Sequence, residues 1–552
     1  MYHGLPTSAY RHHPLVLGVF GQPDGSSARR FFDEAPGARV LTRDSHMEGR
    51  ALGPVDGRGT PFLHWGAAVH SADRHATWQD LSEGSCAAGL VREGRGWVLF
   101  TDAVGINSVY VREWEGSLFF ATRMAPLIAL PGRMNVDWMA WSSIFVMGSP
   151  LGQTTPFLEI NRLEGATGLA FEIDSEPRPV SYSPTWLGQV EDELEPEVLG
   201  EAVREALPPR SALPQSPAIT LSGGWDSRLI AGLAADAYMG RQRAWTSATD
   251  DGLDLDVSFA PAVARMLRMR HTTILQPDSG WPDLAAETRA RAQFETWLHP
   301  WLSPLFRRIR DEELNVLDGL GGDVLIKGLF VNERLLKFSP ERRVERLFRR
   351  LGYQPERRFV GRFREGPAHG VVDLCRQSFL RIASRYSGHM NQLALTVLYA
   401  RTARAIAIAP TCLLAPEVKP WFPFLAPKVL SISLGIQPDS KTDGTLYKKV
   451  LHRCVPLVAD LPSTNDAVAK PSFRRRRIQT GVEATTWMID SILASSTIVE
   501  LFLPNAVASL RTRKPTWEPP DSQVERLLMA CSLFAQWEHL HRDRLVSAAP
   551  PW

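Results

Sequence analysis

Cysteine is scarce in this chain, and the few cysteines are widely separated. The 552 residues include 5 of them, and no two form a C-x-x-C pair. This distribution excludes a disulfide framework, argues against a structural zinc site and is typical of the reducing cytosol. We therefore expect a cytoplasmic protein.

The sequence also lacks an excess of charge of one sign and a long uncharged apolar run. It has 62 Lys+Arg against 60 Asp+Glu, a net charge of +2. A nucleic-acid binder usually shows a strong basic excess, so we expect no nucleic-acid partner. Residues 393–414 are the most apolar stretch, but Arg401 and Arg404 interrupt them. We expect a buried or amphipathic helix there, no membrane span and no targeting segment.

The first 190 residues show short apolar runs separated by turn signals, which predicts a mostly β region. Residues 109–113 and 117–121 lie on either side of Glu115-Gly116 and are typical of a hairpin. One helix is predicted over residues 136–147, with Asn135 or Asp137 as its cap.

After residue 190 strands and helices alternate. Strands are expected at residues 218–221, 244–248 and 271–275, with helices over 227–235 and 256–269 between them. This alternation predicts a parallel, doubly wound sheet. From about residue 280 the chain is predicted to be mostly helical; Trp297 and Trp301 lie in this stretch, and we assign them no role.

The most informative segment is A-I-T-L-S-G-G-W-D-S-R, residues 218–228. A strand leads into two glycines, and a helix is expected to begin near Asp226. Glycines let the backbone approach a phosphate, and the free N–H groups of a helix N-terminus point at it. Ser222 and Ser227 can add hydroxyl donors, and Asp226 suits a magnesium ion that bridges phosphates. The segment lacks the Walker A pattern.

The S-G-G-x-D-S pattern resembles the pyrophosphate-binding loop of the ATP pyrophosphatases, and the arginine after it resembles the asparagine synthetase group among them. The resemblance implies ATP and Mg²⁺ as cofactors. It implies that a carboxylate attacks the α-phosphate, releases pyrophosphate and forms an acyl-adenylate, from which a nitrogen nucleophile displaces AMP. The residues that it assigns to nucleotide binding are Leu221, Ser222, Gly223, Gly224, Asp226, Ser227 and Arg228.

A second glycine-rich segment, L-D-G-L-G-G-D, spans residues 317–323 after a short apolar run. It resembles the G-x-G-x-D loop of the same family. The resemblance implies that Asp323 joins Asp226 as a magnesium ligand and in catalysis, and that Gly319, Gly321 and Gly322 approach the nucleotide. Two separated carboxylates suit Mg²⁺, which keeps several of its waters.

A third segment contains L-P-S at residues 461–463 and A-K-P-S-F at 469–473. It resembles the family pattern of Leu-Pro followed by a lysine before a small and an aromatic residue. The resemblance implies that Lys470 is catalytic and contacts the transferring group, where a cation suits the charge that develops. A solvated loop lysine is the alternative. Residues 416–425 match another family region loosely and make Glu417 a minor candidate.

The first domain resembles the glutaminase-type domain of the family at D-A-V-G, residues 102–105, and L-F-F-A-T, residues 118–122. The resemblance implies an α+β, Ntn-type sandwich over residues 1–190. It implies an α/β domain over residues 191–552, with a parallel sheet of ATP-pyrophosphatase type and many added helices. Active glutaminase domains use an N-terminal cysteine, but residue 2 is Tyr2 and the first cysteine is Cys86. We expect an inactive domain, which argues against a glutamine-dependent asparagine synthetase.

Relatives without that cysteine include β-lactam synthetases and lasso peptide cyclases. β-Lactam synthetases carry a tyrosine of a base dyad three residues before the second aspartate, where this chain has Leu320. A peptide α-amine has a pKa of about 7.7–8.0, so it needs positioning more than a strong base. The resemblance therefore favours a lasso peptide cyclase, which joins an Asp or Glu side chain of a leader-cleaved precursor peptide to its N-terminal amine as a macrolactam.

Other interpretations remain open at this point. The chain could be a β-lactam synthetase-like enzyme or another small-molecule amide ligase. It could also be a non-catalytic scaffold that binds nucleotide or peptide, although intact Asp226, Asp323 and Lys470 argue against that. The expected partner is the precursor peptide, with a leader peptidase and a leader-recognition protein as further candidates.

Overall fold

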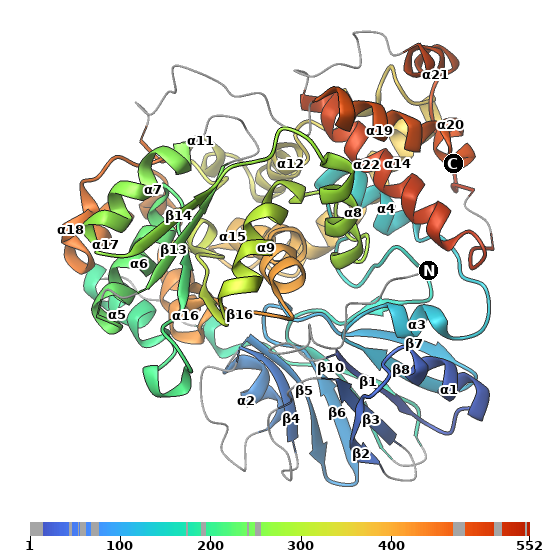
Figure 1. Ribbon diagram of the computed structural model, residues 1–552, viewed down its shortest axis with the longest axis horizontal. Coiled ribbons are helices and arrows are strands. Elements are labelled where there is room, and N and C mark those ends of the chain that lie inside the picture. The colour runs from blue at the N-terminus through green and yellow to red at the C-terminus, as the bar shows by residue number, and fades with distance from the viewer. Residues whose placement is uncertain are drawn as a thin grey trace.

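The computed structural model describes residues 15–43, 47–52, 55, 62–67, 77–84, 86–172, 175–188, 195–239, 242–248, 255–466, 481–512, 522–546 and 549–552. Within these residues the chain forms two antiparallel sheets near the N-terminus, a parallel sheet and a large set of helices (Figure 1). Tyr2 and Lys470 lie outside the described residues.

The N-terminal region contains two antiparallel sheets. The first has the strand order β2-β3-β1-β8-β7-β9, and the second β11-β10-β6-β5-β4. The strands of the first are β1 (Leu15–Phe20), β2 (Arg39–Arg43), β3 (Met47–Leu52), β7 (Tyr110–Trp114), β8 (Ser117–Ala121) and β9 (Asn161–Arg162). Those of the second are β4 (Phe62–Ala67), β5 (Cys86–Glu93), β6 (Gly96–Phe100), β10 (Thr167–Phe171) and β11 (Arg178–Ser181).

The two sheets face each other and carry helices on their outer faces. Successive strand residues point to opposite faces, so β1 contributes to two cores. Val16 and Phe20 pack between the sheets with Trp65, while Leu17 and Val19 belong to a second core on the other face. Helices α1 (Gly25–Asp33) and α3 (Ala125–Ala129) contribute to that second core, and α2 (Trp78–Glu83) covers the other sheet. The region is therefore layered α-β-β-α.

Two local predictions in this region are confirmed. Trp114 pairs with Ser117, and Glu115 and Gly116 between them have φ values of 49° and 72°, as a tight primed hairpin turn requires. Helix α4 (Trp138–Met147) is capped by Asp137, whose side chain accepts from the backbone N–H groups of Met139 and Ala140.

Helix α4 packs among the C-terminal helices. Its closest helical neighbours are α14 (Glu365–Ser384) and α22 (Ser522–His541). The rings of Trp138 and Trp141 lie 5.3 and 4.7 Å from that of Phe534 in α22. The core of the helical region therefore includes a helix from the first 190 residues, and Figure 1 shows α4 beside α14 and α22.

The sheet of the second half is parallel, as predicted. Its order is β14-β13-β12-β15-β16, formed by β12 (Ala218–Thr220), β13 (Arg243–Ser247), β14 (Arg270–Ile274), β15 (Asn315–Leu317) and β16 (Lys419–Trp421). Helices α6 (Trp225–Ala237) and α7 (Leu255–Met266) follow β12 and β13. The strand order reverses between β12 and β15. Ligands of such sheets bind at the carboxyl ends of the strands at this reversal point.

Helices make up most of the remainder. They are α5 (Pro196–Glu205), α8 (Trp281–Arg291), α9 (Ser303–Glu312), α10 (Gly322–Leu325), α11 (Glu333–Leu336), α12 (Pro340–Leu351), α13 (Glu356–Phe359), α15 (Gln392–Val397), α16 (Pro427–Gly435), α17 (Thr445–Cys454), α18 (Pro456–Ala459), α19 (Val482–Leu493), α20 (Ser496–Leu501) and α21 (Pro504–Arg511). Residues Gln392–Leu414 form one helix long and apolar enough to cross a membrane, but 78% of its apolar window is buried inside the protein. This agrees with the predicted buried helix.

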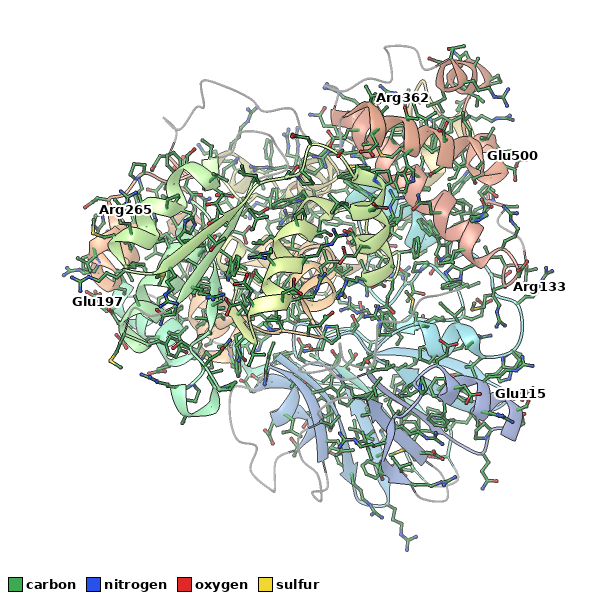
Figure 2. All side chains as sticks on the ribbon, viewed as in Figure 1. Glu115, Arg133, Glu197, Arg265, Arg362 and Glu500 are labelled. Atoms are coloured by element: carbon green, nitrogen blue, oxygen red, sulfur yellow. The ribbon has the colours of Figure 1, made fainter. Side chains whose placement is uncertain are left out.

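Buried polar contacts join the N-terminal sheets to the rest of the chain. Glu295 is 1% exposed, accepts from the Tyr110 hydroxyl at 2.8 Å and pairs with Arg404 at 3.2 Å. The Tyr399 hydroxyl donates to the Ala103 carbonyl at 2.9 Å. Figure 2 shows charged residues such as Glu115 and Glu197 at the outer edges of the two regions.

Lys441 is a buried cation whose charge costs stability. Its Nζ donates to Asn391 Oδ1 and the Ser433 carbonyl, and burial lowers its pKa from 10.5 to about 7. The unfolded chain therefore binds more protons between these values, so this group makes the folded state more stable as pH rises from about 7 to 10.5. Lys441→Met should reduce the rise of the unfolding free energy in this range by up to about 1.4 kcal/mol per pH unit. Urea unfolding of both proteins across that range measures it; parallel pH profiles would contradict the assignment.

Candidate active site

The loop between β12 and α6 is an anion cradle of the predicted kind. The Ser222 and Ser227 hydroxyls lie 2.8 Å apart, and the Ser222 N–H donates to Ser227 Oγ at 3.0 Å. The Gly223 N–H donates to the Asp256 carboxylate at 2.7 Å. A carboxylate on this amide shows that the loop presents a donor suited to an anion.

The second glycine loop lies directly against the first. A Cβ on Gly319 would be 3.3 Å from Asp226 Cβ, and one on Gly322 would be 2.6 Å from Asp226 Oδ1. Gly321 precedes α10 with a φ of 94°, a conformation that favours glycine. The glycines therefore let α10, which carries Asp323 in its first turn, approach Asp226.

Asp226 and Asp323 are neighbouring carboxyl groups at the reversal point of the sheet. Burial and the charge of Asp323 raise the pKa of Asp226 to about 7, against the Tyr447 hydroxyl and Lys327, which lower it. Burial also raises the pKa of Asp323, and the Arg401 guanidinium is the largest opposing influence. Two carboxylates that repel each other in this way suit a divalent cation, which removes the repulsion.

The number of carboxylates also suits magnesium. The residues that the structure describes contain no group of three or more His, Cys, Asp or Glu side chains able to hold a metal. A pair of carboxylates fits Mg²⁺, which binds through one or two of them together with substrate phosphates. Asp318 in the same loop has both oxygens engaged, by the Thr220 hydroxyl at 2.8 Å and the Leu320 N–H at 2.9 Å.

Arg228 holds the third segment against the cradle. Its side chain is 0% exposed, and it donates to the carbonyls of Val458, Leu461 and Pro462 at 3.1, 2.6 and 2.7 Å and to that of Gly223 at 3.4 Å. All these partners are backbone carbonyls, so the structure places Arg228 as a support of two loops. Its predicted contact with nucleotide stays a prediction.

The L-P-S end of the third segment meets the first loop. The Thr464 N–H donates to the Gly223 carbonyl at 3.1 Å. Asn465 accepts a hydrogen bond from Lys327. Described residues end at Asp466 in this segment, so the predicted role of Lys470 stays a prediction. Glu417 pairs with Arg291 through both carboxylate oxygens, at 2.7 and 3.1 Å, which indicates a structural role.

Four side chains at the site were missed from the sequence. Tyr447 in α17 is 0% exposed and donates to Asp226 Oδ1 at 2.6 Å. The ammonium groups of Lys327 and Lys448 each lie 5.6 Å from the centre of the Trp225 ring. Trp225 begins α6, the helix that follows the cradle. The fourth is Asp256, which was read only as the start of a helix. Lys327 follows Asp323 by four residues, a helical spacing that could have suggested it; Tyr447 gave no local signal.

A comparison with family models agrees with this geometry. Residues 197–464 match the family described as asparagine synthase. The match covers just under half of the chain. The matched residues contain both glycine loops, and the family implies in general terms an ATP-dependent, amide-forming ligase. No curated protein matches the chain.

The matched residues bring together groups of the kinds that an ATP-dependent ligase uses. Backbone and hydroxyl donors of the cradle can hold phosphates, Lys327 can add a positive charge, and Asp226 and Asp323 could hold magnesium. These groups at the carboxyl ends of β12 and β15 are compatible with ATP as the family's cofactor.

Tyr447→Phe should weaken magnesium binding with little loss of stability. The hydroxyl orients Asp226 and lowers its pKa, so its removal raises that pKa further and leaves less carboxylate at neutral pH. We expect the Mg²⁺ concentration for half-maximal ATP–pyrophosphate exchange to rise about tenfold, as loss of about 1.4 kcal/mol would give. The acid limb of the pH profile should move to higher pH.

The matched control is Tyr238→Phe. Its buried hydroxyl donates to the Pro208 carbonyl, away from the carboxylates. It should leave the magnesium requirement unchanged. Equal magnesium requirements in Tyr447→Phe and the unaltered protein would show that Tyr447 does not position Asp226.

Proposed function

We propose that this protein is an ATP-dependent peptide cyclase of the lasso type, which joins an Asp or Glu side chain of a precursor peptide to the N-terminal amine of the same peptide. The observation that carries the proposal is the junction of the two glycine loops beside β12 and β15, where Gly322 packs against the Asp226 carboxylate. This junction supports transfer of AMP to a carboxylate.

The proposed reaction has two steps. A carboxylate oxygen of the peptide attacks the α-phosphorus of ATP, the bond from that phosphorus to the bridging oxygen breaks, and pyrophosphate leaves. The amine nitrogen then attacks the acyl carbon, the bond to the adenylate oxygen breaks, AMP leaves, and a proton of the amine passes to solvent. Magnesium at Asp226 and Asp323 would neutralise phosphate charge. The Ser222–Gly224 loop and Lys327 would hold the phosphates in line for attack.

Leu320 supports a peptide amine over a β-lactam-type mechanism. Its side chain is 6% exposed and packs in the apolar core of the sheet domain with Leu317 and Phe424. It accepts no proton, so the position that carries a base-dyad tyrosine in β-lactam synthetases has no such function here. An α-amine that is partly neutral at pH 7 requires no strong base.

The N-terminal region is proposed to be an inactive glutaminase-like domain. Its α-β-β-α layering is compatible with an Ntn-type sandwich. The precursor peptide, a leader peptidase and a leader-recognition protein are proposed partners, and the cytoplasm the proposed location.

Peptide-dependent ATP–pyrophosphate exchange tests the proposal. The full chain is incubated with a core peptide encoded by a neighbouring gene, and with the same peptide acetylated at its N-terminus. Both should drive exchange, because adenylation needs no amine. Only the free peptide should yield a product lighter by one water. If free aspartate drives exchange and neither peptide does, the peptide cyclase proposal is refuted.

A further inference from the structure

A cavity of about 290 Å³ lies among helices α4, α8 and α22 and the helix Gln392–Leu414. We call it the tryptophan cavity; its lining includes Trp281, Trp297, Trp301, Tyr353, Arg401 and Arg526. The end of α4 and the start of α22 complete it, and both lie outside the matched residues 197–464. Figure 1 shows α4, α8 and α22 gathered at this side of the parallel sheet.

Arg401 connects the cavity with the carboxylate pair. It lines the cavity, and its guanidinium carbon lies 5.1 Å from the centre of the Phe330 ring. Phe330 follows Leu329, whose N–H donates to the Asp323 carbonyl at 2.8 Å. Among described residues no carboxylate lies within salt-bridge distance of Arg401. The Arg401 guanidinium therefore lies between the cavity and the carboxylate pair.

Aromatic rings form the rest of the lining. The Arg526 guanidinium lies 3.5 Å from the Tyr353 ring centre and 5.9 Å from that of Trp297. The Trp297 indole is fixed by a 2.7 Å hydrogen bond to the Ile144 carbonyl. Within the described part of the chain, Trp281 Nε1 and Arg526 Nε are buried and have no hydrogen-bond partner. The cavity thus has flat aromatic walls, unused donors and two guanidinium groups, those of Arg401 and Arg526, and its lining also contains the Glu525 carboxylate.

The volume of the cavity and the chemistry of its lining indicate which ligand it can bind. A cavity of about 290 Å³ is at the lower end of the range for small-molecule pockets, roughly 300–1,000 Å³, so it takes a side chain or two and not a whole peptide. Indole, phenol and guanidinium faces favour an aromatic ring. The unpaired cation at Arg401 favours a carboxylate.

We infer that the tryptophan cavity is the acyl-substrate pocket, in which Arg401 binds the carboxylate to be adenylated and the aromatic walls bind an aromatic side chain next to it in the peptide. This inference rests on the proposed function. It adds a substrate preference, for an acidic residue beside an aromatic one, and explains why Trp297 and Trp301 lie together near the site.

Titration calorimetry of the full chain with three dipeptides tests the inference without turnover. Aspartyl-tryptophan should bind about tenfold more tightly than both asparaginyl-tryptophan and aspartyl-alanine, a difference of about 1.4 kcal/mol each. Arg401→Gln should abolish only the preference for Asp over Asn. Trp301→Ala, at a half-buried position, should abolish only the preference for Trp over Ala. If Arg401 and Trp301 only supported the fold, each substitution would weaken both preferences together.

The controls make each outcome decisive. Arg265→Gln, at an exposed position on α7 (Figure 2), should keep both preferences. Absence of either preference in the unaltered protein would overturn the inference. A second result would also overturn it. If AMP displaced aspartyl-tryptophan and Trp301→Ala weakened AMP binding, the cavity would be the pocket for the adenine base.

Exchange measurements separate this inference from the proposed function. If both preferences are found but no peptide drives ATP–pyrophosphate exchange, the pocket stands and the ligase proposal fails. If a peptide drives exchange that neither Arg401→Gln nor Trp301→Ala alters, the ligase stands and the pocket is wrong.

Discussion

Asp226→Ala and Asp323→Ala should each reduce peptide-dependent ATP–pyrophosphate exchange at least about a thousandfold, because a catalytic metal supplies several kcal/mol of transition-state stabilisation. The two glycine loops bring these carboxylates together beside the cradle, where the charge of Asp323 raises the pKa of Asp226. Asp318→Asn is the matched control, since its carboxylate is already engaged by Thr220 and Leu320. Asp318→Asn should lower the exchange rate less than tenfold, which corresponds to a loss of less than about 1.4 kcal/mol of transition-state stabilisation.

The same pair predicts a stability effect that needs no substrate. The pKa of Asp226 rises from 3.8 to about 7 on folding, so the folded state binds more protons than the unfolded state in that window. Stability of the metal-free protein should therefore fall as pH rises from about 4 to 7. Asp323→Ala removes one cause of the shift and should reduce this fall.

Magnesium should raise the unfolding temperature of the unaltered protein at pH 7.5, because binding to the folded state stabilises it. It should have no such effect on either alanine variant. Near-normal exchange in a variant that no longer responds to magnesium would show that the ion at this pair is not needed for the chemistry.

Arg228→Met should lower the free energy of unfolding by roughly 3–5 kcal/mol, the usual effect of disrupting a buried polar group that has several hydrogen-bond partners. The substitution removes the guanidinium donor from the carbonyls of Gly223, Val458, Leu461 and Pro462. It also removes the four guanidinium contacts that tie the third segment to the cradle, so exchange should fall with stability. Urea unfolding and exchange assays on the same preparation measure both.

Arg228→Lys keeps the charge but lacks the planar fork that reaches several carbonyls. It should recover part of the stability and serves if the methionine variant fails to fold. Arg265→Met, at an exposed position on α7, is the control and should change the unfolding free energy by less than about 0.5 kcal/mol. Unfolding of Arg228→Met at the same urea concentration as the unaltered protein would show that the two loops are held by other contacts.

Local sequence signals predicted the elements that depend on a few neighbouring residues. The strand, glycines and helix around Asp226 were recognisable because glycines and a helix start follow one another directly. The cap at Asp137 and the hairpin at Glu115-Gly116 were recognisable for the same reason. The parallel sheet followed from the alternation of strands and helices.

Long-range partners could not be predicted in this way. Tyr447 lies 221 residues from the carboxylate that it contacts, and nothing in its own segment indicates that partner. Arg401 was noted only as a charge that interrupts an apolar stretch, whereas the fold places it between Asp323 and a cavity. Arg228 matched a nucleotide-binding motif, yet tertiary packing gives its guanidinium four carbonyl partners.

The most direct test of the account follows one oxygen atom. A precursor peptide whose acceptor carboxylate carries ¹⁸O is incubated with the full chain, ATP and magnesium, and the nucleotide products are analysed by mass spectrometry. Adenylation at the carboxyl ends of β12 and β15 predicts AMP that contains one ¹⁸O, together with unlabelled pyrophosphate. ADP and ¹⁸O-labelled inorganic phosphate would contradict the account, because they would show transfer of the γ-phosphoryl group instead of AMP.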